Sequence, residues 1–274
     1  MKPIPFYKMS GAGNDFVIID NRQQIVPDAD LTGFISKVCR RKISAGADGL
    51  ILIEPSDTYD FRWRFFNSDG GPAEMCGNGA RCAARFAYVN GITGTALSFE
   101  TEAGVVSAQI DNDRVKVKMP DPSNLKLSYA LELSSCSLDI SSINTGVPHV
   151  VVMVEKIDDV DVVALGREIR FHQAFAPAGT NVNFVHRHKG NEIQIRTYER
   201  GVEDETLACG TGAIASAIVS ACQLQINSPV DVKTRSGEYL RIHFNLKDGR
   251  FDQIYLEGDA RIIYTGELQP DAFK

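Results

Sequence analysis

The sequence lacks a basic excess, a long apolar run and a signal segment. Its 29 Lys and Arg residues are outnumbered by 35 Asp and Glu residues, which gives a net charge of −6 at pH 7. Nucleic acids and anionic membranes usually attract a basic surface, so we expect neither as a partner. No stretch approaches the roughly 20 apolar residues of a membrane span, and residues 1–8 lack the apolar core of a signal peptide. These absences predict a cytoplasmic protein that acts on a small molecule.

Cysteine is sparse as well. Six cysteines in 274 residues are too few for a disulfide scaffold, so we expect free thiols in a reducing compartment. No Cys-x-x-Cys or His-x-x-x-His spacing occurs, and we therefore predict no bound metal. With 43% hydrophobic and 23% charged residues, the composition is that of a globular protein. The length suffices for one large domain or for two of ordinary size.

One local arrangement occurs twice, a glycine-rich turn that places a cysteine at the start of a helix of small residues. The copies read Cys-Gly-Asn-Gly-Ala from Cys76 and Cys-Gly-Thr-Gly-Ala from Cys209, close to half a chain length apart. A single copy is more often explained by turn and packing requirements. The repetition favours a functional role for this arrangement and indicates that the chain consists of two related halves.

The residue types of each copy suggest its chemistry. Glycines leave the backbone N–H groups of the turn open to an anion, and the positive end of a helix lowers the pKa of a thiol from about 8.5 toward neutrality. Two such thiols on opposite faces of one carbon can invert a stereocentre, because a thiolate removes the α-proton and the opposing thiol returns a proton. The substrate carboxylate would lie between the two helix starts. The pattern predicts a cofactor-free racemase or epimerase.

Hydrophobic patterning outlines helices and strands in both halves. Helical spacing predicts helices over residues 31–38 and 161–169 and after each of the two cysteines. Short apolar or alternating runs predict strands at 16–19, 50–53, 61–66, 105–110, 115–119, 150–154, 193–198, 230–233, 240–246, 254–256 and 260–264. Prolines at 120 and 122 interrupt this pattern, so we place the domain boundary there, with residues 1–121 in the N-terminal half and 122–262 in the C-terminal half.

Several segments resemble the diaminopimelate epimerase family, in the family's order and over nearly the whole chain. They are Met9–Phe16, Asn67–Cys82, Gly146–His149, Gly179–Phe184, and Tyr198–Gly201 running into Cys209–Ala213. The resemblance implies an α/β fold of the α+β kind with two pseudo-symmetric domains. Each domain is a mostly antiparallel sheet or barrel wrapped around a central helix, with the active site in the cleft between them. It also implies that residues from about 263 to 274 complete the N-terminal half, and that a homodimer forms with Tyr264 at its contact.

The activity implied by the resemblance is the interconversion of LL-2,6-diaminopimelate and meso-diaminopimelate in lysine biosynthesis, without pyridoxal phosphate or metal. Cys76 and Cys209 would be the two catalytic thiols, and His149 and Glu199 would tune their protonation. Arg200 would hold the distal carboxylate of the substrate, and Glu199 its distal ammonium. The other substrate contacts that the resemblance implies are Asn14, Asn67, Gly77, Asn78, Asn181, Gly210 and Thr211.

Two positions depart from the family pattern, and alternatives stay open. Many members carry a substrate-contacting Gln near the position of Gly49 and an Asn at that of Val147; neither residue here offers a side-chain amide, and Asn144 is the nearest substitute. A racemase of another amino acid on the same fold is one alternative, although Glu199 and Arg200 argue against it because a single-ended amino acid needs no distal clamp. A non-catalytic amino-acid-binding protein is another, and a thiol hydrolase is a third.

Overall fold

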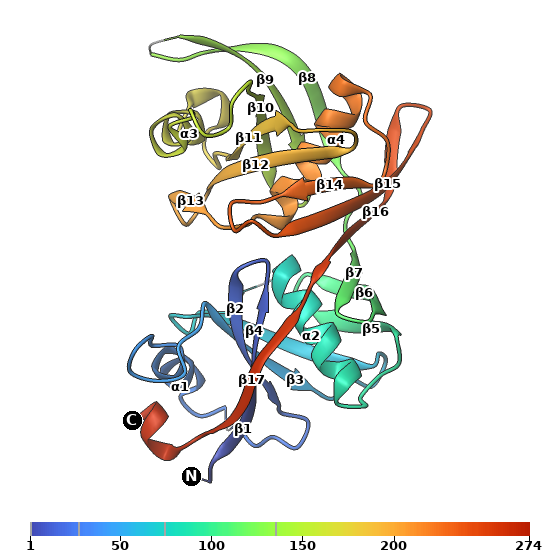
Figure 1. Cartoon of the computed structure of the whole chain (residues 1–274). Coiled ribbons are helices and arrows are strands. Elements are labelled where there is room, and N and C mark those ends of the chain that lie inside the picture. Colours follow the sequence, from blue (N-terminus) through green and yellow to red (C-terminus); the bar gives the residue numbers. More distant parts are fainter. Residues whose placement is uncertain (1, 27, 74, 135) are drawn as a thin grey trace. The chain divides into compact units, whose positions relative to one another are not determined.

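The computed structural model describes residues 2–26, 28–73, 75–134 and 136–274. The chain divides into two compact units, one made of Met1–Val117 with Gly258–Lys274 and the other of Lys118–Glu257. Each unit packs helices on an open, mostly antiparallel sheet (Figure 1). The predicted fold class, α/β with a central helix against a mostly antiparallel sheet in each half, is confirmed.

The strands of the first unit pair in the order β17-β1-β2-β3-β4-β5-β6-β7. Their bounds are β1 Ile4–Gly11, β2 Asn14–Asp20, β3 Gly49–Glu54, β4 Phe61–Asn67, β5 Ala96–Thr101, β6 Gly104–Asp111, β7 Arg114–Lys118 and β17 Arg261–Leu268. Pairs β2–β3 and β4–β5 are parallel and the others antiparallel. The late strand β17, red in Figure 1, lies along β1, blue, with Tyr264 opposite Lys8.

Helices cover both faces of this sheet. The α2 helix, Gly77–Val89, packs on β1, β2, β3 and β6, and its buried face consists mainly of small residues, as predicted for a closely enclosed helix. The α1 helix, Leu31–Val38, lies on the other face and contacts the short 3-10 helix η2, Pro270–Phe273. Because both faces are covered, β2 and β3 contain continuous buried apolar runs, residues 16–19 and 50–53, instead of alternating.

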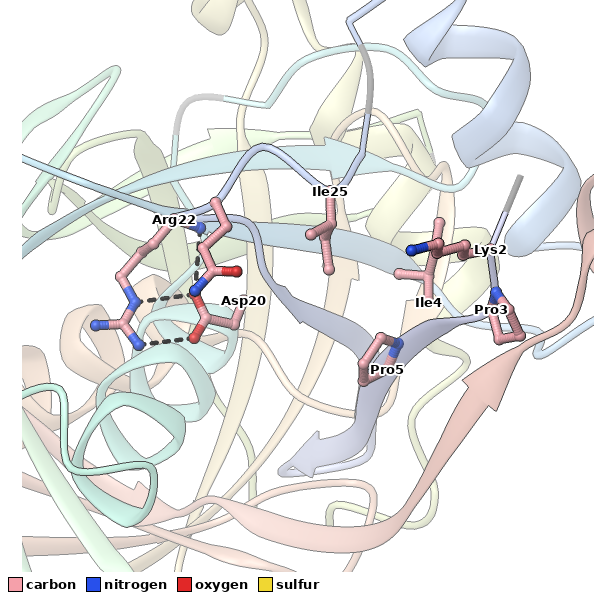
Figure 2. A pocket seen from close by; sticks show the side chains of 8 residues that line it. Lys2, Pro3, Ile4, Pro5, Asp20, Arg22 and Ile25 are labelled. Carbon is pink, nitrogen blue, oxygen red and sulfur yellow. Dashed lines mark hydrogen bonds and ion pairs between the residues drawn. The ribbon is translucent and has the colours of Figure 1, made fainter.

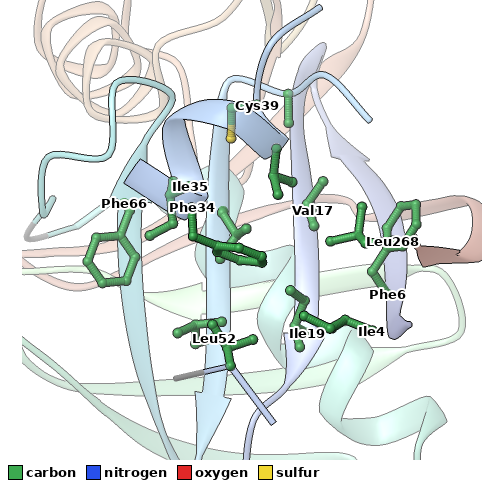
Figure 3. Packing of buried hydrophobic residues seen from close by; sticks show 14 of the residues in the cluster. Ile4, Phe6, Val17, Ile19, Phe34, Ile35, Cys39, Leu52, Phe66 and Leu268 are labelled. Carbon is green, nitrogen blue, oxygen red and sulfur yellow. The ribbon is translucent and has the colours of Figure 1, made fainter. Parts of the chain in front are cut away.

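Figure 3 shows the core beneath α1, where Phe34, Ile35 and Cys39 meet alternate residues of the strands, among them Val17 and Ile19. The strand residues in between face α2, since an added Cβ at Gly79 would lie within 3.5 Å of Ile51, Phe16 and Trp63. Period-two alternation therefore sends each apolar run into two separate cores.

The second unit pairs its strands in the order β8-β9-β10-β11-β12-β14-β15-β16, and β13 pairs with β12. Their bounds are β8 Ser123–Glu132, β9 Ser137–Asn144, β10 Pro148–Met153, β11 Asn181–Arg187, β12 Glu192–Glu199, β13 Asp204–Thr206, β14 Val230–Lys233, β15 Tyr239–Lys247 and β16 Arg250–Asp259, the last ending just inside the first unit. Pairs β10–β11 and β12–β14 are parallel.

Two further helices complete the second unit. The α4 helix, Gly210–Leu224, packs on β9, β10, β11, β12, β14 and β15, and its buried residues are mostly Ala, Ser and Ile. The α3 helix, Val162–Arg170, begins at Asp161, whose carboxylate accepts a hydrogen bond from the backbone N–H of Ala164 at 3.0 Å. The 3-10 helix η1, Gln173–Phe175, follows it. In both units, the helix that starts at a motif cysteine is the one enclosed by strands.

Candidate active site

Cys76 is the N-cap residue of α2. Its backbone is extended, with φ −144° and ψ 117°, and its Sγ accepts a hydrogen bond from the backbone N–H of Gly79 at 3.5 Å. The thiol therefore occupies the place of the Ser or Asp side chain that usually caps a helix. It lies at the positive end of the helix, where a thiolate is stabilised.

Cys209 repeats this geometry at the start of α4. Its φ and ψ are −121° and 112°, and its Sγ accepts from the backbone N–H of Gly212 at 3.4 Å. The Thr211 hydroxyl lies 3.5 Å from the same sulfur. Cys209 is buried, whereas Cys76 is partly exposed. The two copies of the motif thus build the same helix-capping thiol, one in each unit.

In the first unit, the Asn14 amide lies beside the Cys76 thiol. Asn14 begins β2, and its Oδ1 lies 3.5 Å from Cys76 Sγ. Its Nδ2 donates to the Asp48 carboxylate at 2.6 Å. The structure therefore places Asn14 beside Cys76 at the start of α2. Asn67 ends β4, where its backbone pairs with Gly70 and Gly71 to close a turn.

Arg81 is a residue that the sequence reasoning missed. Its side chain is 0% exposed, and it donates to Asn78 Oδ1 at 3.0 Å, to the Gly77 carbonyl at 3.3 Å and to the Asp259 carbonyl at 3.2 Å. Burial lowers the pKa of Arg81, while the neighbouring thiols of Cys82 and Cys76 oppose that shift. The Asn78 side-chain oxygen is thus engaged within the protein. A charged residue inside a helix of alanines was the available signal.

In the second unit, His149 is buried at the start of β10. Its Nδ1 lies 3.1 Å from Asn183 Nδ2, so Nδ1 accepts and the ring proton resides on Nε2. Burial, with a smaller effect from the Arg200 charge, lowers the pKa of His149 to about 3. Within the part of the chain that the structure describes, the buried Nε2 has no hydrogen-bond partner. His149 is therefore neutral and holds an unused N–H donor.

Asn183 links His149 to the Cys209 turn. Its Nδ2 donates to the Val150 carbonyl at 3.0 Å, and its Oδ1 accepts from the Thr197 hydroxyl at 3.0 Å. An added Cβ at Gly212 would lie 2.3 Å from Asn183 Oδ1 and 3.2 Å from Cys209 Sγ. The sequence reasoning named Asn181 but missed Asn183. A second asparagine two residues along the same buried strand was the signal.

Glu199 and Arg200 follow at the end of β12. The Arg200 backbone N–H donates to Asn181 Oδ1 at 2.7 Å, and its guanidinium donates to the Ala178 carbonyl at 3.3 Å. Burial raises the pKa of Glu199. Asn181 also donates to the Pro148 carbonyl at 3.4 Å, so its amide links the start of β10 to the Arg200 backbone. The structure thus connects Asn181 and Arg200, with Glu199 beside them in the chain.

Comparison with known proteins identifies the family. The family model described as "Diaminopimelate epimerase" matches residues 6–125 and 141–263. A diaminopimelate epimerase of Aquifex aeolicus is 48% identical over 98% of this chain and 99% of its own length. One of Hydrogenobaculum sp. is 44% identical over 97% and 99%. This chain belongs to the diaminopimelate epimerase family.

Solved structures with lower sequence identity share the fold. A Bacillus anthracis phenazine biosynthesis protein of the PhzF family has a TM-score of 0.74 at 16% identity, covering 98% of this chain and 100% of its own. A hydroxyproline epimerase from Agrobacterium vitis has a TM-score of 0.68 at 15% identity, covering 98% and 93%. The fold is therefore common to this diaminopimelate epimerase family member and to proteins with other names.

The structure accounts for one departure from the family pattern. At Gly49, an added Cβ would lie 2.6 Å from the Phe66 carbonyl oxygen and 2.7 Å from the Phe65 ring, so this backbone has no room for a longer side chain. Asn144 Oδ1 accepts from the Gly146 backbone N–H at 2.9 Å and so shapes the turn that carries Val147. Neither Gly49 nor Val147 supplies a side-chain amide at the two positions where the resemblance implies one.

Two further surface features of this diaminopimelate epimerase family member are Tyr264 and a pocket near its N-terminus. Tyr264 is 45% exposed on β17 and packs edge-on against Phe6, with ring centroids 5.9 Å apart. Figure 2 shows a pocket of about 730 Å³ in the first unit, in which Arg22 pairs with Asp20 at 2.7 and 2.9 Å. None of the predicted site residues lines it: it is formed by Lys2, Pro3, Ile4, Pro5, Asp20, Arg22, Gln23 and Ile25.

Residues 2–26, 28–73, 75–134 and 136–274 show neither a metal site nor a membrane span. There, no group of three or more His, Cys, Asp or Glu side chains is placed to hold a metal ion. Within the same ranges, no helix combines the length and the apolar character that crossing a membrane requires. All six cysteines are free thiols.

Proposed function

We propose that this chain interconverts LL-2,6-diaminopimelate and meso-diaminopimelate by proton transfer between two thiols. The observation that carries the proposal is the pair of cysteine N-caps, Cys76 on α2 and Cys209 on α4, with matching geometry in a chain of the diaminopimelate epimerase family. One thiol alone could return a proton only to the face from which it was taken. Two thiols that reach the same carbon invert it.

The reaction needs no redox step. One sulfur, as thiolate, takes the α-hydrogen as a proton, and the electron pair of the C–H bond stays on the substrate as a carbanion delocalised into its carboxylate. The other sulfur, as thiol, gives its proton to the opposite face of that carbon and becomes the thiolate. Backbone N–H groups at the starts of α2 and α4 stabilise the negative charge on the carboxylate. No pyridoxal phosphate or metal is required.

The remaining predicted residues bind the substrate or tune the protonation of the thiols. His149 is neutral and offers its Nε2–H as a donor, while Asn183 fixes its ring through Nδ1. Arg200 binds the distal carboxylate of the substrate, and Glu199 its distal ammonium. Burial raises the pKa of Glu199, which makes this carboxylate a better proton acceptor than an exposed one. Substrate contacts from Asn14, Asn67, Gly77, Asn78, Asn181, Gly210 and Thr211 belong to the same proposal.

Cellular setting and assembly are also part of the proposal. Catalysis by two free thiols requires a reducing compartment, which supports a cytoplasmic location. A homodimer forms through the surface around Tyr264, where the neighbouring Ile263 is 54% exposed. Sedimentation of the reduced protein, compared with a Tyr264→Glu variant, tests this assembly.

The deciding experiment uses reduced protein and LL-2,6-diaminopimelate in deuterated water without added cofactor. Deuterium at the α-carbon together with meso product supports the proposal. Cys76→Ala and Cys209→Ala should each abolish epimerisation, whereas Cys222→Ala, at a half-buried thiol away from both helix starts, should retain it. No exchange by folded, reduced protein overturns the proposal, and proline and other amino acids would then be screened.

A further inference from the structure

The orientation of the Asn14 amide is fixed by a carboxylate. Asn14 Nδ2 donates to Asp48 Oδ2 at 2.6 Å, and the other end of the same amide, Oδ1, lies 3.5 Å from Cys76 Sγ. If the amide turned over, its oxygen would face the carboxylate oxygen, and two acceptors would meet without a proton between them. Asp48 therefore selects the orientation in which the amide oxygen faces the sulfur.

The Asp48 carboxylate is itself held in place. Arg41 donates to Asp48 Oδ1 at 2.7 Å, and the Asp15 backbone N–H donates to Asp48 Oδ2 at 3.1 Å. In return, the Asp48 backbone N–H donates to Asp15 Oδ1 at 3.1 Å. The two aspartates thus bind each other's backbone across the parallel strands β2 and β3. An acceptor anchored on both oxygens cannot rotate to accommodate a turned amide.

Further charged groups, one exposed and one buried, extend this network. Arg41 also forms two hydrogen bonds to Asp15, at 2.5 and 3.2 Å. Lys8, which is only 7% exposed, pairs with Asp15 Oδ2 at 2.7 Å and also donates to the Gly46 carbonyl. Two cations and two anions balance, so the group adds no net charge beside Cys76. What it supplies to the thiol is the direction of the Asn14 dipole.

That direction decides which form of Cys76 is favoured. An amide oxygen accepts hydrogen bonds and cannot donate them, so it stabilises the S–H form of Cys76 and destabilises the thiolate. The corresponding neighbour of Cys209 is the Thr211 hydroxyl at 3.5 Å, which can rotate to donate or accept. Asn14 therefore presents an acceptor to Cys76, whereas Thr211 can present a donor to Cys209.

We propose that Asp48, held by Arg41, is a positioning residue that keeps the Asn14 amide oxygen turned toward Cys76 and so favours the thiol form of Cys76. This role belongs to the free protein and does not depend on the proposed function.

The test measures alkylation of each cysteine by iodoacetamide at neutral pH, quantified by mass spectrometry of the reduced protein. Only the thiolate reacts. Wild-type Cys76 should react more slowly than a cysteine at a helix start that has no amide oxygen beside its sulfur. In Asp48→Ala, the amide is free to turn its NH₂ toward the sulfur, and Cys76 alkylation should rise about three- to tenfold, the range expected for one hydrogen bond. Cys209 alkylation should not change.

Two variants separate orientation from charge. Asp48→Asn removes the charge but keeps an oxygen that accepts from Asn14 Nδ2, so Cys76 reactivity should stay near wild type. If charge alone mattered, Asp48→Asn would behave like Asp48→Ala, and the proposal would be wrong. Asp20→Ala removes a similarly exposed partner of an arginine elsewhere in the first unit and serves as the matched control. Its alkylation pattern should equal that of wild type.

Cys76 alkylation in a double variant distinguishes the proposed role of Asp48 from a simple loss of structure. Asn14→Ala should raise Cys76 alkylation as Asp48→Ala does, and Asp48→Ala in the Asn14→Ala background should add nothing. Independent, additive effects overturn the proposal. Epimerase assays on the same samples keep the two ideas apart. An inactive wild type with the expected alkylation pattern refutes the function only, while an active wild type with unchanged alkylation refutes the role of Asp48.

Discussion

Replacing Gly212 by alanine tests how closely α4 packs against a buried amide. An added Cβ there would lie 2.3 Å from Asn183 Oδ1. Asn183 cannot retreat freely, because it is 0% exposed and bonded to Thr197, Val150 and His149. Gly79 holds the same motif position in the first unit, but its nearest neighbours are apolar side-chain atoms at 3.3 to 3.5 Å. The two substitutions therefore differ in packing while sharing their local sequence.

The expected cost combines three contributions. Overpacking costs about 1 to 3 kcal/mol, and loss of a buried hydrogen bond of Asn183 costs roughly 1 to 3 kcal/mol. Better helix propensity of alanine returns up to about 1 kcal/mol. We expect Gly212→Ala to lower the free energy of unfolding by roughly 3 kcal/mol, and Gly79→Ala to change it by less than about 1 kcal/mol.

Urea unfolding measures both variants. Far-UV circular dichroism reports both units, and fluorescence of Trp63, the single tryptophan, reports the first unit. Equal slopes with urea are needed before midpoints are compared. The reasoning is refuted if both variants lose the same stability, or if Gly212→Ala is as stable as wild type.

Three further predictions concern acid stability and the last strand. Burial raises the pKa of Asp15, but Arg41 and Lys8 outweigh burial and lower this pKa from 3.8 to about 2. The contribution of the ionised Asp15 to stability is therefore complete above about pH 4 and is lost as pH falls through about 2. With allowance for solvent screening, Asp15→Asn should reduce this acid-dependent loss by about 1 to 2 kcal/mol in urea titrations. His149 stays neutral down to a pKa of about 3 against 6.5 unfolded, so stability should fall as pH drops below about 6.5, and His149→Gln should remove that slope. Leu268→Ala should cost about 2 to 5 kcal/mol in thermal or urea unfolding, while the exposed Glu267→Ala should stay within about 0.5 kcal/mol.

Local patterns in the sequence predict the elements that carry strong signals. The helices that begin after Cys76 and Cys209 are announced by Gly-x-Gly-Ala and by runs of small residues, and α2 and α4 start at these positions. Strand β8 gave no such signal and was missed, because only one of its residues is buried. A strand that is mostly exposed has no hydrophobic alternation for the sequence to reveal.

The candidate site likewise has parts that the sequence could predict and parts that it could not. The capping geometry of Cys76 and Cys209 follows from residues within one turn, so it could be anticipated. The contact of Arg81 with Asp259 spans 178 positions, and those of Asn183 with His149 and Asn14 with Asp48 each span 34. No local pattern records such partners. The catalytic and binding roles of the site residues stay predictions until the assays above are done.

The pairing of β17 with β1 has a consequence for the order in which the protein is made. Residues 118–257 form an uninterrupted unit, whereas the first unit needs residues 258–274, which are synthesised after it. At about 5 to 20 residues per second, β1 waits roughly twelve to fifty seconds for its neighbour. During that interval β1 is an unpaired edge, and Ile4 and Phe6 lack the cover of Leu268. The second unit can therefore finish folding first, while the earlier-made unit keeps an open edge until β17 has been synthesised.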